Sequence, residues 1–415
     1  MESMFYPGLT NAAPRQGLAS RGKNHIILVG RRYDIKAVLV RLHGVKNSLT
    51  IEQLEPWCTR NQHVQNAMAQ TRILLTGATG YIGGSVLTTL KASTAVEVQS
   101  AQIDVLIRGP ERVPEFENLG VGVIVFTSLD ETEFIRKLAS DYDVIVNTAS
   151  AFHTESAIAM ITGLHERETK TGQKTHFIHT SGTSSIADRP VSKVYLESRE
   201  LHDTDDVYAY QQSREAHEAY KQRTTDLAVF RTGMDLSVKT TIIMAPTIFG
   251  IGTGPVNRLS IQIPALIRRA LHYGHAVVIG DGQAEWDHVH IADLVTLFEL
   301  VLVKVLKGED VPYGAKGLLF AETGRHTWMD VSRGIAAAGS ELGLLATDEV
   351  RSVSLPEAAA WASNGNAQVR ELGFASNARS KATLSRALGW QPQKTETDWH
   401  GAFKEDFEAI AKTVI

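Results

Sequence analysis

Residues 73–85 read ILLTGATGYIGGS, an apolar run that breaks into glycines and then continues at helical spacing. This pattern predicts a buried strand, a tight turn and the start of a helix. Gly77 and Gly80 allow backbone conformations and close approaches that a Cβ atom would obstruct, and Gly83 lets the helix pack close to the sheet. The N–H groups at the helix start then face outward with the positive end of its dipole, which suits a pyrophosphate.

The sequence around this turn predicts the rest of the sheet. A helix is expected over Ser85 to Leu90, and a second strand follows about twenty residues after the turn. From Thr71 onward, apolar runs alternate with helical patterns, as in βαβ units with parallel strands. The expected strands are 73–76, 103–107, 122–126, 144–147, 176–180 and 240–244. The predicted fold is α/β, a doubly wound parallel sheet (Rossmann) that binds ligands at the carboxyl ends of its strands.

The composition fits a globular chain with a large core. The chain has 415 residues, of which 43% are apolar, and its net charge of -4 predicts no general attraction to nucleic acid or to anionic membranes. The single cysteine, Cys58, excludes an intrachain disulfide framework and favours a reducing, cytoplasmic location. The longest apolar helix candidate, Leu294 to Leu306, contains two charged residues and is too short to span a bilayer, so we expect a core helix and no membrane partner.

The second strand bears on the choice of nicotinamide cofactor. An acidic residue at its end accepts hydrogen bonds from a ribose 2′-hydroxyl, whereas an arginine suits a 2′-phosphate. Here Arg108 stands at that end, and Arg112 follows closely. The sequence therefore predicts NADP(H) in preference to NAD(H), with NAD(H) as the alternative. Thr148 and Ala149, small residues after the fourth strand, are expected where the ribose and linker of the dinucleotide pass.

Three segments are expected along the chain. Residues 1–70 contain prolines, glycines and an excess of Arg and Lys, with one strand, His25 to Val29. We expect an irregular N-terminal extension there, and a targeting sequence is the alternative. Residues 71–250 are expected to form the NAD(P)-binding domain. Residues 251–415, after a Gly-rich link, are expected to form a smaller C-terminal substrate lobe and C-terminal helices, interleaved with the Rossmann core.

Four stretches resemble the extended branch of the short-chain dehydrogenase/reductase superfamily, with its NAD-dependent epimerase/dehydratase-like and NmrA-like proteins. They are Thr76–Gly83, Thr180–Ser184, the pair Gly280–Gly282 and Trp286–Leu294, and Gly389–Pro392. The resemblance covers residues 72 to 392, and the stretch Pro246–Pro255 is similar to fungal NAD(P)-binding proteins. It implies a dinucleotide held by the glycine turn, a small-molecule substrate and a homodimer. The implied cofactor-binding residues are Gly77, Thr79, Gly80, Tyr81, Ile82, Gly83, Arg108, Thr148, Ala149, Pro246 and Thr247.

The resemblance also implies a catalytic trio in which a tyrosine moves the proton, a serine orients the carbonyl, and a lysine four residues after the tyrosine lowers its pKa. Ser181 matches the serine, although its hydroxyl could instead close a turn. The tyrosine is harder to assign, because no tyrosine in residues 208–221 has a lysine four residues later. Tyr210 has Arg214 at that spacing, and His217 precedes Lys221 by four residues. Tyr210 ranks first and His217 second, and a role for neither is the remaining alternative.

Trp286 bears on the substrate. It occupies the position where sugar-nucleotide enzymes of the extended branch carry an arginine, so its ring favours an apolar or aromatic substrate over a diphosphate sugar. A tryptophan packed in the core is the alternative. The neighbouring Asp287, His288 and His290 give no complete ligand set, and no metal is predicted. Two functions follow: an NADP(H)-dependent oxidoreductase or epimerase/dehydratase acting on a small carbonyl or alcohol, or a catalytically silent NADP(H)-binding regulator of the NmrA-like kind.

Overall fold

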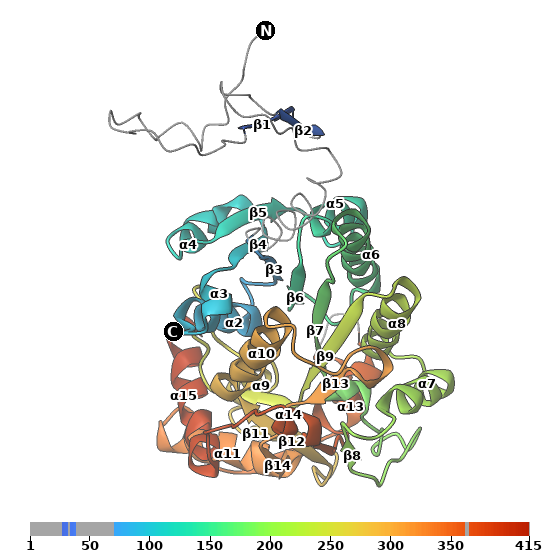
Figure 1. Cartoon of the computed structure of the whole chain (residues 1–415). Helices are drawn as coiled ribbons and strands as arrows, with labels where there is room; N and C mark the ends of the chain where they lie inside the picture. Colours follow the sequence, from blue (N-terminus) through green and yellow to red (C-terminus); the bar gives the residue numbers. More distant parts are fainter. Residues whose placement is uncertain (1–26, 32–33, 39–69, 362–364, 415) are drawn as a thin grey trace, which may run out of the picture. The chain divides into compact units, whose positions relative to one another are not determined.

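A seven-stranded parallel sheet runs through the computed structural model, in the order β13-β9-β7-β6-β3-β4-β5 (Figure 1). Six of these strands coincide with those expected from sequence, and the predicted doubly wound α/β fold is confirmed. The seventh, β13, was not predicted, because it has three residues in a region without regular alternation. The strands are β3 (Arg72–Thr76), β4 (Gln102–Arg108), β5 (Gly122–Phe126), β6 (Val144–Asn147), β7 (His176–Gly182), β9 (Lys239–Ala245) and β13 (Leu318–Phe320).

The structure describes residues 27–31, 34–38, 70–361 and 365–414. The chain divides into two units, Met1–Ala69 and Gln70–Ile415. In the first unit, β1 (Ile27–Arg31) pairs with β2 (Asp34–Val38) in an antiparallel hairpin. The strand expected at 25–29 overlaps β1, whereas β2 was not predicted. Cys58 and the other predictions for the extension lie outside the described residues.

The strand order reverses at β3, which decides where a ligand can bind. β3 pairs with β4 on one side and with β6 on the other, and Thr76 is in register with Asn147. The chain builds β3, β4 and β5 toward one edge and then returns to build β6, β7, β9 and β13 toward the other. The carboxyl ends of β3 and β6 therefore flank the switch point where doubly wound sheets bind ligands.

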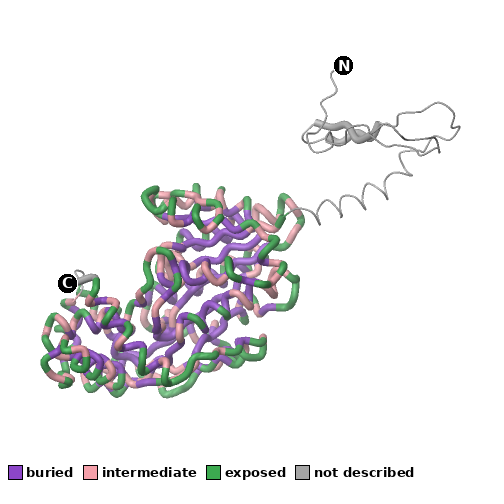
Figure 2. Tube along the Cα trace, turned by 90° about the vertical axis from the view of Figure 1, so that its left-hand side faces the viewer, coloured by how far each residue is buried: buried purple, intermediate pink, exposed green. Residues whose placement is uncertain are grey.

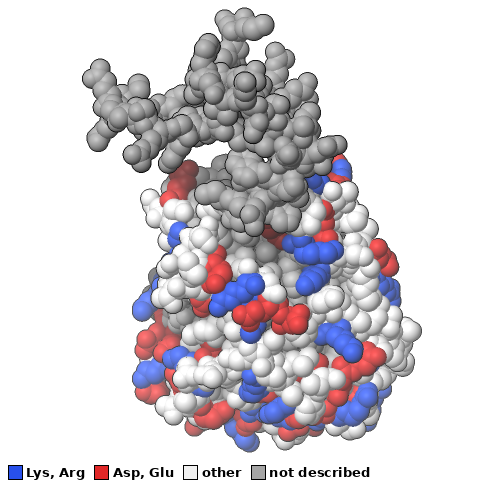
Figure 3. All heavy atoms as spheres, in the orientation of Figure 1, with Lys and Arg blue, Asp and Glu red and all other residues white. Residues whose placement is uncertain are grey.

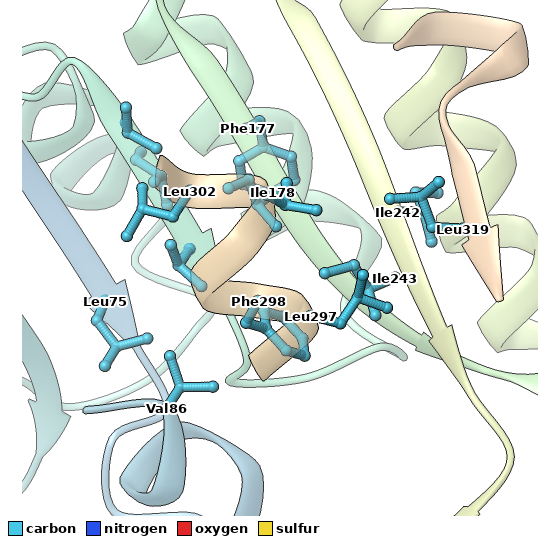
Figure 4. Close-up of a cluster of buried hydrophobic side chains, with 14 of the residues drawn as sticks. Leu75, Val86, Phe177, Ile178, Ile242, Ile243, Leu297, Phe298, Leu302 and Leu319 are labelled. Carbon is cyan, nitrogen blue, oxygen red and sulfur yellow. The ribbon is translucent and has the colours of Figure 1, made fainter. Parts of the chain in front are cut away.

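Helices cover both faces of the sheet (Figure 1). On one face α5 (Thr132–Ala139), α6 (Thr154–Thr171) and α8 (Lys221–Leu236) pack in sequence, and on the other α2 (Tyr81–Ala92) packs against α10 (Ile291–Leu306). Figure 4 shows Leu297 and Phe298 of α10 among side chains of β7 and β9. The helix expected at 294–306 is thus part of α10, and its apolar residues belong to the core of the sheet.

A second apolar core lies in the C-terminal part of the chain. It contains residues from α9 (Gln262–Tyr273), α11 (Trp328–Glu341) and α15 (Glu396–Val414), together with the parallel pair β11 (Ala276–Ile279) and β15 (Val350–Val353). A small sheet of β10 (Thr247–Phe249), β12 (Glu285–His290) and β14 (Gly324–Thr327) adjoins it. The shorter elements are α3 (Val96–Gln99), α4 (Val113–Glu117), α7 (Val207–His217), α12 (Leu355–Ala359), α13 (Ala367–Phe374), α14 (Thr383–Ala387), β8 (Leu201–His202) and β16 (Ser380–Lys381).

Buried residues follow the strands, and charges of both signs are mixed on the surface. In Figure 2 buried residues run along the strands of the sheet, and exposed residues occupy the outer turns and helix faces. Figure 3 shows Lys and Arg mixed with Asp and Glu on the face of Figure 1, as the small net charge leads one to expect. No helix in the described part of the chain is long and apolar enough to cross a membrane.

Candidate active site

The glycine turn after β3 is shaped by contacts that exclude side chains. Gly77 has φ +76°, and a Cβ atom there would lie 2.6 Å from the backbone of Thr148, in the loop after β6. A Cβ on Gly83 would overlap the Thr148 side chain and lie 2.7 Å from the carbonyl carbon of Gly77. The Gly80 N–H donates to the Gly77 carbonyl at 2.8 Å and closes the turn. Glycine is therefore required at 77 and 83 by close packing against the neighbouring loop.

Helix α2 begins directly at this turn. Tyr81 is the first residue of the helix. The N-cap residue is Gly80, which has no side chain that could cap the helix. The first N–H groups of an α-helix have no acceptor within the helix, and they carry the positive end of its dipole. These donors, next to a loop that admits no Cβ, fit the pyrophosphate of a dinucleotide.

A cavity of about 690 Å³ extends from this turn to the C-terminal part of the chain. It is lined by the residues after four neighbouring strands of the sheet and by side chains from the second core. From the first group come Gly80, Tyr81, Ile82, Thr148, Ala149, Ser150, Ala151, Phe152, Thr180, Ser181, Gly182, Thr183, Ser184, Ala245 and Pro246. Others that line it are Tyr220, Gln222, Ile261, Gln262, Trp286, Val369, Arg370 and Phe374.

Ser181, at the end of β7, connects this cavity with a buried carboxyl group. Its Oγ donates to Asp226 Oδ2 at 2.9 Å, and Gln211 Nε2 donates to the same oxygen at 3.0 Å. Asp226 is fully buried in α8, and burial raises its pKa to about 7, although the hydrogen bonds from Ser181 and Gln211 oppose the shift. A carboxyl group that exchanges its proton near neutral pH thus lies one hydroxyl away from the cavity.

A second hydroxyl pair lines the same wall. Tyr220, the N-cap residue of α8, donates from its hydroxyl to Ser184 Oγ at 3.2 Å, and Ser184 in turn donates to Gln222 Oε1. Phe152 meets the Tyr220 ring edge-on, with 6.0 Å between ring centroids. Burial raises the pKa of Tyr220, so this phenol is a hydrogen-bond donor at neutral pH and a poor base.

Tyr210 and His217 do not line the cavity. The Tyr210 hydroxyl donates to the carbonyl of Ile186 at 3.1 Å, and burial raises its pKa. The arginine four residues later, Arg214, lies over the Tyr195 ring at 3.5 Å and donates to the Ala187 carbonyl. Burial of Tyr210 outweighs the lowering of its pKa by the Arg214 charge. His217 Nε2 lies 3.3 Å from the carbonyl of Val194. The chain turns between α7 and α8, and this turn brings Tyr220 to the cavity in place of the two expected residues.

The expected cofactor residues divide into four groups. Gly80, Tyr81, Ile82, Thr148, Ala149 and Pro246 line the cavity, whereas Gly77 and Gly83 shape the turn behind it. Thr79 accepts a hydrogen bond from Asn257 N, and Thr247 is buried in β10, so neither lines the cavity. Arg108 is exposed at the end of β4 and has no ion-pair partner in the described part of the chain.

Trp286 forms part of the cavity wall, and its neighbours stabilise the fold. The Trp286 indole donates to Thr183 Oγ1 and meets the Trp328 ring edge-on at 5.0 Å. Asp287 is bonded to Arg325 and Ser380, and His290 caps α10. The described residues include no cluster of three or more His, Cys, Asp or Glu side chains that could hold a metal ion.

The sequence did not predict Tyr220 or Asp226 at this cavity. Tyr220 lies between His217 and Lys221, but the residue four positions after it is Thr224 and not a lysine. Asp226 lies in a segment rich in polar residues, which is typical of a solvent-exposed helix face. Its position in the sequence does not indicate that its side chain is completely buried. Both assignments depend on where α8 lies against β7.

Three comparisons place these features among known proteins. The model of the NAD dependent epimerase/dehydratase family matches residues 73–313. Oxidase ucsJ of Acremonium sp is 29% identical over 335 residues, which cover 77% of this chain and 92% of that protein.

Solved structures match in fold. The dTDP-glucose 4,6-dehydratase DesIV of Streptomyces venezuelae, solved with NAD bound, has a TM-score of 0.54 and 17% identity, over 82% of this chain and 97% of that one. The UDP-glucose 4-epimerase of Thermotoga maritima, solved with UDP-glucose, has a TM-score of 0.52 and 16% identity, over 83% of this chain and 100% of that one. At such identities these structures support the fold alone.

Proposed function

The chain belongs to the NAD dependent epimerase/dehydratase family, and from this premise we propose that it is an NAD(P)(H)-dependent oxidoreductase or epimerase/dehydratase acting on a small organic carbonyl or alcohol. The proposal depends on one observation: a single cavity is bordered both by a site for the dinucleotide and by a hydroxyl that can act on the substrate oxygen. The start of α2 borders it on one side, and the Ser181 hydroxyl on another. A dinucleotide and a carbonyl oxygen can therefore meet within one cavity.

The glycine turn would hold the cofactor. The N–H groups at the start of α2 would bind the pyrophosphate, and Thr148 and Ala149 would contact the ribose of the cofactor. Arg108 is exposed at the end of β4 and has no ion-pair partner among the described residues. It supports the preference for NADP(H), since a guanidinium binds a 2′-phosphate by charge-assisted hydrogen bonds. When bound, the nicotinamide supplies or accepts a hydride.

Ser181 and Asp226 would move the proton. In carbonyl reduction, Ser181 Oγ donates its proton to the substrate oxygen, and the protonated Asp226 returns one to Ser181. In alcohol oxidation, the same protons move in the opposite direction. Tyr220 would hold the oxygen from a second side, since its hydroxyl lies in the same wall. We assign these residues the role that the sequence suggested for Tyr210 and His217.

Purified protein with NADPH and a panel of ketones, aldehydes and enones tests the proposal. We expect turnover that Ser181→Ala reduces at least about 100-fold, because general acid–base catalysis contributes that much or more. The control is Ser352→Ala, whose hydroxyl donates to Gly280 O on an exposed strand outside the cavity. Tight NADPH binding without turnover on the whole panel would contradict the enzyme and favour the silent regulator.

A further inference from the structure

A smaller cavity of about 150 Å³ adjoins the main one, and we call it the arginine annex. It is lined by Ala265, Leu266, Arg268, Arg269, Trp361, Arg370 and Phe374. Ala265, Arg370 and Phe374 line both cavities. A ligand in the main cavity can therefore extend to the guanidinium groups of the annex.

Helices α9 and α13 bring two of these guanidinium groups together. Arg370 lies over the Phe374 ring, with 5.5 Å from its guanidinium carbon to the ring centroid. Arg269 lies 5.6 Å from the Trp361 ring centroid and donates from Nη2 to the Trp361 carbonyl at 3.0 Å. The Trp361 indole donates in turn to the Tyr273 hydroxyl at 3.2 Å, so hydrogen bonds fix the position of Arg269.

Arg370 has unused hydrogen-bonding capacity. Its Nε atom is buried and has no hydrogen-bond partner among the described residues. Neither Arg269 nor Arg370 forms an ion pair with a carboxylate in the described part of the chain. Burial, and to a smaller extent the charge of Arg269, lowers the pKa of Arg370. Two like charges held together without a counter-charge are unfavourable unless an anion binds between them.

The main cavity next to the annex is apolar. Ile261 is 80% exposed, Phe152 40% and Val369 38%, and all three line the cavity. Large apolar side chains exposed in a concave site mark the place where an apolar ligand binds. Trp286 also lines this wall, with 2% of its surface exposed.

We propose that the substrate is an organic acid with a flat apolar or aromatic body, and that Arg370, with Arg269 beside it, binds its carboxylate. This inference rests on the proposed function and names the substrate class of that site. The body lies along the apolar wall, and the reacting oxygen meets Ser181, which lines the same cavity as Arg370. A planar guanidinium can bind a carboxylate through two parallel hydrogen bonds, which gives orientation as well as affinity.

Calorimetric titration of the full chain, saturated with NADPH, tests the proposal with a matched pair of probes. They are 2-naphthoate, which carries the carboxylate, and 2-naphthamide, which has the same shape and no charge. We expect naphthoate to bind at least tenfold more tightly than naphthamide. Arg370→Ala should weaken naphthoate at least tenfold and change naphthamide less than twofold, and Arg370→Lys should restore part of the loss. The control is Arg351→Ala, which removes an exposed arginine paired with Glu349.

Three results would overturn the proposal: equal affinity for the two probes, naphthoate binding that survives in Arg370→Ala, or displacement of naphthoate by micromolar UDP-glucose. The last result would assign the annex to a diphosphate sugar. NADPH affinity is measured separately in each variant. A failure of the proposed function appears as lost NADPH binding or absent turnover, and a failure of this inference appears only in the naphthoate affinities.

Discussion

The two sides of the main cavity are built in different ways. On the cofactor side, thirteen consecutive residues form strand, turn and helix, and the donors are backbone N–H groups. On the reacting side, Ser181, Gln211 and Asp226 come from β7, α7 and α8 and meet through side chains. A backbone site can be recognised from a short sequence motif, whereas a side-chain site of this kind depends on how distant elements pack.

The largest expected effect tests the reacting side. Asp226→Asn keeps the shape of the side chain but removes its exchangeable proton, so we expect turnover to fall at least about 100-fold. Since the pKa of Asp226 is about 7 and reduction needs its protonated form, carbonyl reduction by the wild type should decline as the pH rises above about 7. Alcohol oxidation should show the opposite trend.

The pH–rate profile of the variant provides the check. Asp226→Asn should lose the limb near pH 7 in both directions and keep its NADPH affinity, measured by nucleotide fluorescence. Normal turnover and an unchanged pH–rate profile in this variant would show that Asp226 does not transfer the proton. The proposed difference between the two sides of the main cavity would then lose its main support.

The next effect tests the cofactor side. Gly83→Ala places a Cβ against Thr148 and Gly77, and overpacking of this kind costs about 1 to 3 kcal/mol. Because the strain falls on the turn itself, we expect NADPH affinity to fall by up to about 100-fold. Gly401→Ala in α15 is the control, since a Cβ there meets nothing within 4 Å. If the Gly83 variant binds NADPH normally, the turn is not the pyrophosphate site.

A smaller effect tests the selectivity of the cofactor side. Arg108→Ala should weaken NADPH about tenfold or more, since a hydrogen bond to a charged group contributes about 1.5 to 3 kcal/mol, and should leave NADH unchanged. Glu111 folds back against Gly109 near the same strand end, where a carboxylate could accept from a ribose hydroxyl. Glu111→Gln should therefore weaken NADH more than NADPH. An unchanged NADPH dissociation constant in Arg108→Ala would refute the predicted preference.

The smallest effect compares two tyrosines. Tyr220→Phe removes one hydrogen-bond donor from the cavity wall and should lower turnover about fivefold, the equivalent of about 1 kcal/mol. Tyr210→Phe removes a hydroxyl bonded to a backbone carbonyl outside the cavity and should change turnover less than twofold. Steady-state rates on the best carbonyl of the panel decide between them, and a larger loss in Tyr210→Phe would restore the assignment suggested by the sequence.

The sequence by itself determined most of the sheet and the glycine turn after β3. Periodicity places six of its seven strands, all but β13. Gly77 and Gly83 can be recognised in the sequence because only glycine meets the steric demand at those positions. It also predicted that Ser181 lies at the ligand-binding edge, because the expected strand ends at Thr180. In the structure Ser181 lies near the end of β7 and lines the cavity.

Only the tertiary structure decided which groups accompany Ser181. The local spacing of Tyr210 and Arg214 suggested a pair, yet Arg214 packs on Tyr195 and the turn before α8 brings Tyr220 to the cavity. Burial of Asp226 against β7, and the approach of Arg370 to Arg269, join residues far apart in the chain. Proton affinity and charge pairing depend on the surrounding dielectric and neighbours, which helix packing creates and local sequence does not encode.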